Sequence, residues 1–209
     1  MPSHSFYAHA ICFVVLAVLF GFCLQYCPLK AGSDVQDCVS SIKSRKSIRK
    51  FDEAKSISEE DMKTIIECGM SAPSAMNERS SHFVVVRDQA IRDKLADFYP
   101  YAQFIRDPTA VAVLVCSETS KLIIPEYWQQ DCGAATENML VAAASMGIGS
   151  TWSGVFPMQE SKENEVRAIL GIPDGIKVFN IIGFGYPDGT SLTPRESRFD
   201  AARFHNDKW

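Results

Sequence analysis

Apolar residues recur along the chain at spacings that switch between helix and strand. Ser58 and the three acidic residues after it form a capping box, and Met62, Ile65 and Ile66 follow at helical spacing. The near-continuous apolar run over 110–116 predicts a strand that is buried on both faces. Further strands are predicted over 83–86 and 178–184, and further helices over 88–98, 131–146 and 159–170. This order predicts an α/β (α+β) domain with a mixed central sheet flanked by helices.

The helix predicted over 131–146 is the strongest in the chain. From Met139 to Met146 it is apolar nearly all round, and Gly147 and Gly149 end it. Such a helix must be buried on more than one side. In a domain of this size, we expect a second copy of the chain to cover part of it.

The N-terminal segment differs from the rest of the chain. Residues 1–29 contain no Lys, Arg, Asp or Glu, and every residue from Ile11 to Leu24 is apolar, Gly or Cys. A signal peptide needs an apolar run of about 7 to 15 residues and a spanning helix needs about 20. No basic residue precedes this run and no small-x-small cleavage site ends it. Membrane anchor, cleaved signal, core helix and misassigned start codon therefore all stay open.

We accordingly predict a hydrophobic N-terminal segment over 1–30, a linker over 31–39 and one globular domain over 40–209. An anchor through residues 6–24 predicts a membrane-associated or secretory protein. If the segment has no targeting role, we expect a cytoplasmic one.

Composition narrows the function classes. The 209 residues are 46% hydrophobic and 22% charged, which suits one domain with a sizeable core. The net charge of −4, from 21 basic and 25 acidic residues, argues against a general nucleic-acid binder. Seven cysteines without a C-x-x-C pair predict reduced thiols rather than a disulfide framework or a metal site.

The sequence offers no side-chain catalyst. Only His82 and His205 lie in the domain, too few for a typical zinc or Ser-His-Asp centre. Phosphate-loop, dinucleotide-binding and G-x-S-x-G motifs are absent from the sequence. An enzyme with this sequence would take its chemistry from a cofactor, and we predict neither a catalytic side chain nor a metal.

A basic segment is the first positive signal. Four cations and two hydroxyls lie between Ser44 and Phe51. Arg45, Ser47 and Arg49 alternate, so that in an extended segment they project to one side, as a phosphate monoester requires. The alternatives are a solvated basic turn and a weak nuclear-import-like patch.

Three further stretches combine small and basic residues. The stretch 71–77 follows a helix and reads as a tight loop that can approach a flat ligand, or as an ordinary turn. The stretch 147–157 leaves the apolar helix with unshielded backbone, and Arg195 and Arg198 add two guanidinium groups near the C-terminus.

Together these stretches resemble the FMN-dependent nitroreductase family over about residues 40–209. The matching motifs are R-[RK]-S-x-R-x-F, S-A-P-S-x-x-N, D-C-x-A-A-x-x-N-M-L running into G-x-G-S-x-W, and the terminal R-x-x-R-F…H-x-D-x-W. All of them occur here in order. The resemblance implies a homodimer with interlocked helices and one FMN in each of two interface clefts.

The resemblance also assigns roles to residues. It implies that the FMN phosphate and ribityl chain are held by Arg45, Lys46, Ser47 and Arg49, and that Arg198, or alternatively Arg195, completes the phosphate site. It implies that the flavin ring is lined by the partner's copies of Pro73, Ser74 and Asn77. Backbone groups near the N5 and O4 edge of the ring are expected from Thr151, Trp152, Ser153 and Gly154. Such donors stabilise the electron density that reduced flavin gains there.

One departure concerns the residues after Asn77. The family commonly has x-Gln-Pro-Trp there, whereas this chain has Glu78-Arg79-Ser80-Ser81-His82. Arg79 would place a cation near the flavin or its substrate. It could favour anionic substrates, raise the flavin reduction potential, or face solvent.

We therefore predict a ping-pong oxidoreductase that passes hydride from NADH or NADPH through flavin N5 to a small-molecule acceptor, such as a nitroaromatic or a quinone. One alternative is a membrane-anchored reductive dehalogenase of the iodotyrosine deiodinase type, although the stretch between Arg87 and Asp131 lacks an obvious lid insertion. The other is a flavin-binding or structural protein without turnover.

Overall fold

The computed structural model of the chain describes residues 38–157, 160–190 and 196–209. The predicted N-terminal segment, most of the linker and Arg195 lie outside these residues, so the predictions made for them stay predictions. Within the described part of the chain, no helix is long and apolar enough to cross a membrane.

Four strands form one sheet in the order β1-β2-β4-β3. They are β1 Ser81–Val86, β2 Val111–Glu118, β3 Gly149–Gly154 and β4 Ile176–Gly185. All three strand pairings are antiparallel, and the described residues add one parallel bridge, between Ser47 and Ser150. The predicted fold class, a sheet flanked by helices, is confirmed.

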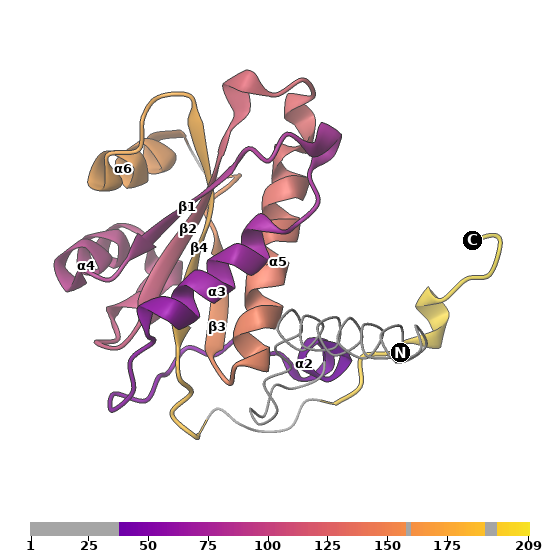
Figure 1. Ribbon diagram of the computed structural model, residues 1–209, viewed down its shortest axis with the longest axis horizontal. Coiled ribbons are helices and arrows are strands. Elements are labelled where there is room, and N and C mark those ends of the chain that lie inside the picture. The colour runs from indigo at the N-terminus through magenta and orange to yellow at the C-terminus, as the bar shows by residue number, and fades with distance from the viewer. Residues whose placement is uncertain (1–37, 158–159, 191–195) are drawn as a thin grey trace, which may run out of the picture. The chain divides into compact units, whose positions relative to one another are not determined.

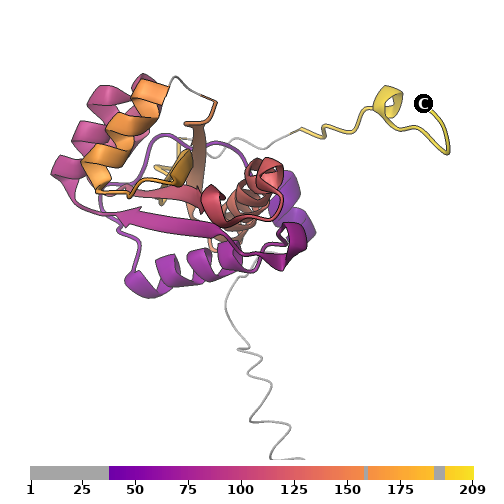
Figure 2. The same ribbon diagram turned by 90° about the horizontal axis from the view of Figure 1, so that it is seen from above.

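Two layers of helices enclose the sheet. Helices α3 (Glu59–Met70) and α5 (Trp128–Ser145) cover one face, and α4 (Gln89–Phe98) and α6 (Glu160–Leu170) cover the other (Figures 1 and 2). Among the described residues, the remaining α-helix is α2 (Cys38–Ser44), and the 3-10 helices are η1 (Ala75–Asn77), η2 (Pro100–Arg106), η3 (Thr119–Lys121), η4 (Pro125–Tyr127) and η5 (Ala201–Arg203).

All but the first residue of the apolar run over 110–116 lies in strand β2, which is buried on both faces of the sheet. Val111, Val113 and Val115 pack in the core beneath α3 and α5, whereas Ala112 and Leu114 pack with residues of α4 and α6. Successive side chains of a strand point to opposite faces, so a strand between two helix layers must be apolar at every position.

Local signals set the helix ends. The Ser58 hydroxyl accepts a hydrogen bond from the Asp61 amide at 3.0 Å, which confirms the predicted cap of α3. At the end of α5, Gly147 takes a φ of 72°, and the Ile148 amide donates to the Ala143 carbonyl at 2.8 Å. This is the left-handed glycine ending that the sequence predicted.

The last turns of α5 are covered unevenly. Met139, Leu140 and Ala143 are buried against the sheet and α3, while Val141 and Ala142 are only half-buried. In the described part of the chain, α5 is therefore buried on one side and only half-buried on the other.

Strand β3 was not predicted. The stretch 149–154 contains Gly, Ser, Thr and a single Trp, so it lacks the alternation of aliphatic residues that would indicate a strand. Pairing with β4 makes it a strand, in the register Thr151 to Gly183 and Ser153 to Ile181. Long-range pairing thus outweighs a weak local propensity.

Candidate functional site

The basic segment lies against the start of β3. The Ile48 amide donates to the Ser150 carbonyl at 2.9 Å, and the Thr151 hydroxyl donates to the Ile48 carbonyl. The buried Ile48 side chain sits over Gly149, where an added Cβ would come within 2.8 Å of the Ile48 Cβ. Glycine at this position therefore permits the close approach that fixes the segment to the sheet.

The segment's charged residues have different surroundings. The Arg45 Nε lies 3.3 Å from a carboxylate oxygen of Glu137 on α5. Ser47 and Arg49 are exposed on either side of the buried Ile48. The predicted alternation therefore holds for Ser47 and Arg49, whereas Arg45 is held towards α5.

The outer edge of β3 carries the backbone groups of the site. Because β3 ends the sheet, alternate residues direct their amide and carbonyl away from β4. The Ser150 carbonyl accepts from the Ile48 amide, so the backbone groups of Ser150 point away from β4. At the C-terminal end of β3, the Gly154 carbonyl also points away from β4 and accepts from the Tyr99 hydroxyl. Trp152 lies between these two residues and belongs to the same alternating set. Its amide and carbonyl thus face the outer edge beside the basic segment.

The side chains of Thr151 and Ser153 tie neighbouring segments to β3. Both side chains are buried, and the Ser153 hydroxyl donates to the Tyr101 carbonyl at 3.1 Å. The Thr151 hydroxyl likewise donates to a backbone carbonyl, that of Ile48. These two residues hold the basic segment and η2 against β3, while the backbone of Trp152 remains at the exposed edge.

The loop between α3 and β1 is anchored to α5. The Ala75 amide donates to the Asp131 Oδ1 at 2.9 Å, and Asp131 is only 6% exposed. On the other side of the loop, the Ile123 amide donates to the Glu78 Oε1 at 2.8 Å. A cavity of about 350 Å³ lies behind the loop. Its lining residues include Pro73, Ser74, Arg79, Phe83 and Asp131.

Sequence reasoning gave Asp131 no role, although it is the first residue of the quoted D-C-x-A-A motif. An acidic residue in the first turn of a helix is common, because it complements the helix dipole, so its presence alone does not point to a tertiary contact. Only the folded chain shows that its carboxylate reaches across to the backbone of a loop 56 residues earlier.

Arg198 lies near α2. With Ile42 and Lys43 it lines a cavity of about 490 Å³, and its side chain is exposed. The structure thus places the C-terminal guanidinium beside the helix that leads into the basic segment, while its alternate, Arg195, lies outside the described residues.

Arg92 is a buried cation that is linked to the end of the basic segment through Asp107. Arg92 is only 2% exposed, and its guanidinium donates to the carbonyls of Ile105 and Asp107, both at 2.5 Å. Asp107 in turn accepts from the Phe51 amide at 3.4 Å. Burial lowers the pKa of Arg92, and the neighbouring acidic residues oppose that shift. The sequence gave no signal for this network.

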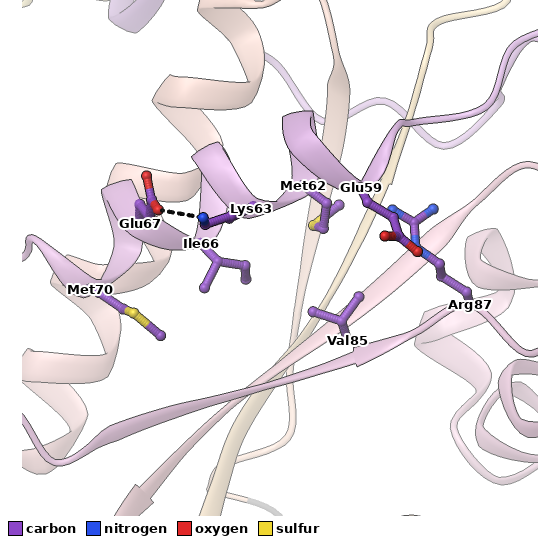
Figure 3. A pocket seen from close by; sticks show the side chains of 8 residues that line it. All are labelled: Glu59, Met62, Lys63, Ile66, Glu67, Met70, Val85 and Arg87. Atoms are coloured by element: carbon purple, nitrogen blue, oxygen red, sulfur yellow. Dashed lines mark ion pairs between the residues drawn. The ribbon is translucent and has the colours of Figure 1, made fainter.

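An apolar groove lies between α3 and β1 (Figure 3). It has a volume of about 410 Å³, and Met62, Ile66, Met70 and Val85 form its apolar wall. Lys63 and Glu67 at its rim pair with each other at 3.7 Å. A phosphate ligand needs converging donors, so this groove does not suit one.

No group of three His, Cys, Asp or Glu side chains among the described residues could hold a metal ion. The described cysteines are free thiols. Burial raises the pKa of Cys116 and of Cys132 to about 12, so both are protonated and unreactive at neutral pH.

These features define an α+β protein with cations, hydroxyls and backbone groups gathered at the edge of its sheet. The model of the Nitroreductase family matches residues 42–122 and 100–186, and the chain belongs to the nitroreductase family.

Individual relatives agree with this assignment. An Archaeoglobus fulgidus protein named "Putative NADH dehydrogenase/NAD(P)H nitroreductase" is 40% identical over 84% of this chain and 100% of its own length. A crystal structure of a protein of the same name from Parabacteroides distasonis superposes with a TM-score of 0.76, at 32% identity, over 83% of this chain and 99% of its own. The NADPH-flavin oxidoreductase of Vibrio harveyi is 27% identical over 74% of this chain and 67% of its own length.

Proposed function

We propose that the protein is an FMN-dependent NAD(P)H oxidoreductase that reduces nitroaromatic, quinone or similar small-molecule acceptors by a ping-pong reaction. The observation that carries this proposal is the position of the basic segment. It lies at the outer edge of β3, with a hydroxyl and backbone groups beside its cations. The names of the relatives, an NAD(P)H nitroreductase and an NADPH-flavin oxidoreductase, support the same activity.

The donor set fits FMN. Arg45, Lys46 and Arg49 carry the positive charge that a phosphate monoester requires, and Ser47 adds a hydroxyl at an exposed position. The Trp152 amide at the sheet edge supplies a fixed dipole, which suits the polar edge of a flavin ring. When bound, FMN would supply the redox chemistry, which is the transfer of hydride from NAD(P)H to the acceptor through flavin N5.

The protein's own contribution is position and electrostatics. Arg45 and Arg49 hold the anionic end of the cofactor, and Arg198, or Arg195, completes the phosphate site. Thr151 and Ser153 keep β3, the basic segment and η2 together, so that the edge of β3 stays in register with the cations. Protons for the reduced acceptor can come from water, which agrees with a site that needs no side-chain acid.

A homodimer completes the proposed site. Pro73, Ser74 and Asn77 would come from the partner and line the flavin ring. Two observations support a second copy: the far side of α5 is only half-buried, and every described residue after residue 195 is exposed. Those terminal residues include Phe199, Phe204 and Trp209, aromatic side chains that a folded protein normally covers.

The reductive dehalogenase is the weaker alternative. The chain between Arg87 and Asp131 is occupied by α4, η2, β2, η3 and η4, which build the sheet and its outer layer. The Archaeoglobus relative is matched over its whole length, and its name is that of a nitroreductase.

The proposal is tested on the purified full chain. We expect bound flavin with a yellow spectrum, and oxidation of NADH or NADPH that depends on menadione or a nitrofuran. A colourless protein that gains no absorbance from added FMN would contradict the proposal. Bound flavin without acceptor-dependent turnover would instead indicate the non-catalytic flavin-binding alternative.

The phosphate site has its own test. Arg45→Ala and Arg49→Ala should each weaken FMN binding, because each removes a charge-assisted contact worth about 1.5 to 3 kcal/mol. Fluorescence titration with FMN measures the loss. Lys63→Ala is the matched control, since Lys63 is an exposed cation on α3 that pairs with Glu67. If all three variants bound FMN as tightly as the unmodified chain, the phosphate would lie elsewhere.

A further inference from the structure

The loop that carries Asn77 has an unusual backbone. Met76, Asn77 and Arg79 have φ angles of 51°, 57° and 52°, so three non-glycine residues within four positions are left-handed. Side chains other than glycine are disfavoured in this region, and clusters of such residues persist where the surrounding structure holds them at a functional site.

Hydrogen bonds fix Arg79 within this loop. Its amide donates to the Ser74 hydroxyl at 2.9 Å, and its Nε donates to the Asn77 Oδ1 at 3.0 Å. Ser74 and Asn77 are the same residues that the proposed function places on the flavin ring. The backbone and the Nε of Arg79 are therefore tied to Ser74 and Asn77, and the residue is exposed.

The nearest acidic residues are directed elsewhere. Glu78 accepts from the Ile123 amide and Asp131 accepts from the Ala75 amide, and the second oxygen of each carboxylate is buried. Within the described residues, no carboxylate lies within 4.0 Å of Arg79, whereas Arg45, Arg106, Arg167 and Arg203 all form ion pairs. Arg79 is exposed, and it lines the cavity of about 350 Å³ together with Pro73 and Ser74.

We propose that Arg79 is a specificity-determining residue that favours anionic electron acceptors. The acceptors that Arg79 would favour are aromatic nitro compounds or quinones that carry a carboxylate or sulfonate. Its anionic group would pair with the terminal guanidinium nitrogens of Arg79, while its ring lies beside Pro73 and Ser74. This inference rests on the proposed function, because that function places the loop at the flavin.

The test compares two acceptors of similar size, 4-nitrobenzoate and 4-nitrobenzyl alcohol. The ratio of their kcat/KM values is measured for the full chain, for Arg79→Gln, for Arg79→Lys and for Arg106→Gln. Arg106 is a matched control because it is an arginine that pairs with Asp93, on the α4 side of the sheet. The neutral acceptor also reports whether each variant folds and turns over.

We expect Arg79→Gln to lower the nitrobenzoate preference roughly threefold to tenfold, as for an exposed charge-assisted contact. Arg79→Lys should retain part of the preference and Arg106→Gln all of it. Added salt should reduce the preference of the unmodified chain but not that of Arg79→Gln.

An unchanged ratio in Arg79→Gln would overturn the inference, even if FMN binding weakened, because Arg79 would then be a cofactor ligand rather than an acceptor ligand. Failure of the proposed function gives a different result. In that case the unmodified chain would reduce neither acceptor.

Discussion

The loop between α3 and β1 is held in position by single polar contacts. The Asp131 carboxylate is buried, and one of its oxygens accepts the Ala75 amide while the other has no hydrogen-bond partner among the described residues. A buried carboxylate with one satisfied oxygen lowers stability, so Asp131 holds the loop in place at a cost to the fold.

This contact predicts opposite results for two substitutions. Asp131→Ala leaves the Ala75 amide without an acceptor, so we expect a loss of about 1 to 3 kcal/mol in the free energy of unfolding, with weaker FMN retention. Asp131→Asn keeps an acceptor oxygen and removes the buried charge, so stability should be equal or higher. Urea unfolding and FMN titration measure both effects. Equal damage from Asn and Ala would contradict this role.

The buried thiols predict a pH dependence. In the unfolded chain Cys116 ionises near its ordinary pKa of 9.0, whereas in the folded protein its pKa is about 12. The folded state therefore holds the proton more tightly, and its stability falls as pH rises from 9 towards 12, by about 1.4 kcal/mol per pH unit for each thiol. Below pH 9 the thiol has no such effect.

Urea unfolding at pH 8, 9 and 10 tests this expectation on the unmodified chain and on Cys116→Ala. The difference between the two isolates this thiol from other groups that titrate in the same range. The variant should lose less stability with rising pH. Parallel pH profiles would argue against a buried, protonated Cys116.

At the scale of elements, the site depends on contacts between segments that carry no catalytic groups. Strand β3, the basic segment and the stretch before β2 hold one another through Ile48, Thr151 and the Arg92–Asp107–Phe51 network. Disturbing one packed contact should therefore change both stability and cofactor binding.

Gly149→Ala tests this coupling. The new Cβ would lie 2.8 Å from the Ile48 Cβ and 2.9 Å from its Cγ2, so Ile48 and the basic segment must shift. We expect a loss of about 1 to 3 kcal/mol in stability, together with weaker FMN binding. Gly133→Ala is the control, because nothing lies within 4 Å of its Cβ, and alanine in a helix should be neutral or stabilising. Thermal unfolding and FMN titration measure the two effects. FMN binding by Gly149→Ala as tight as that of the unmodified chain would contradict the coupling.

At the scale of the whole molecule, the described residues leave one side of α5 half-buried and the C-terminal aromatic side chains exposed. We expect the full chain to have twice its monomer mass in solution. Replacing Phe204 and Trp209 by Ser should weaken this dimer, because both side chains are exposed in the single chain and lose apolar contact area. Analytical ultracentrifugation over a concentration series measures the effect. A monomer that binds FMN with full affinity would contradict the two-copy site.

Local patterns were sufficient for much of this protein. The cap at Ser58, the continuous apolar run of β2 and the glycine after α5 each predict an element, because they act within a few residues. The basic segment and its motifs likewise indicated an anion site and the nitroreductase family. Hydrophobic periodicity and helix-end signals are local properties of the sequence, so they can be interpreted without knowing which segments pack together.

Tertiary structure alone decided the rest. Nothing in the residues of β3 predicts a strand, because its stability comes from pairing with β4. The anchoring of the loop by Asp131 and the support of the basic segment by Arg92 join residues far apart in the chain. Arg79 acquires its position only through Ser74 and Asn77 in a left-handed loop. Such long-range contacts depend on which surfaces meet in three dimensions, and no local pattern encodes them.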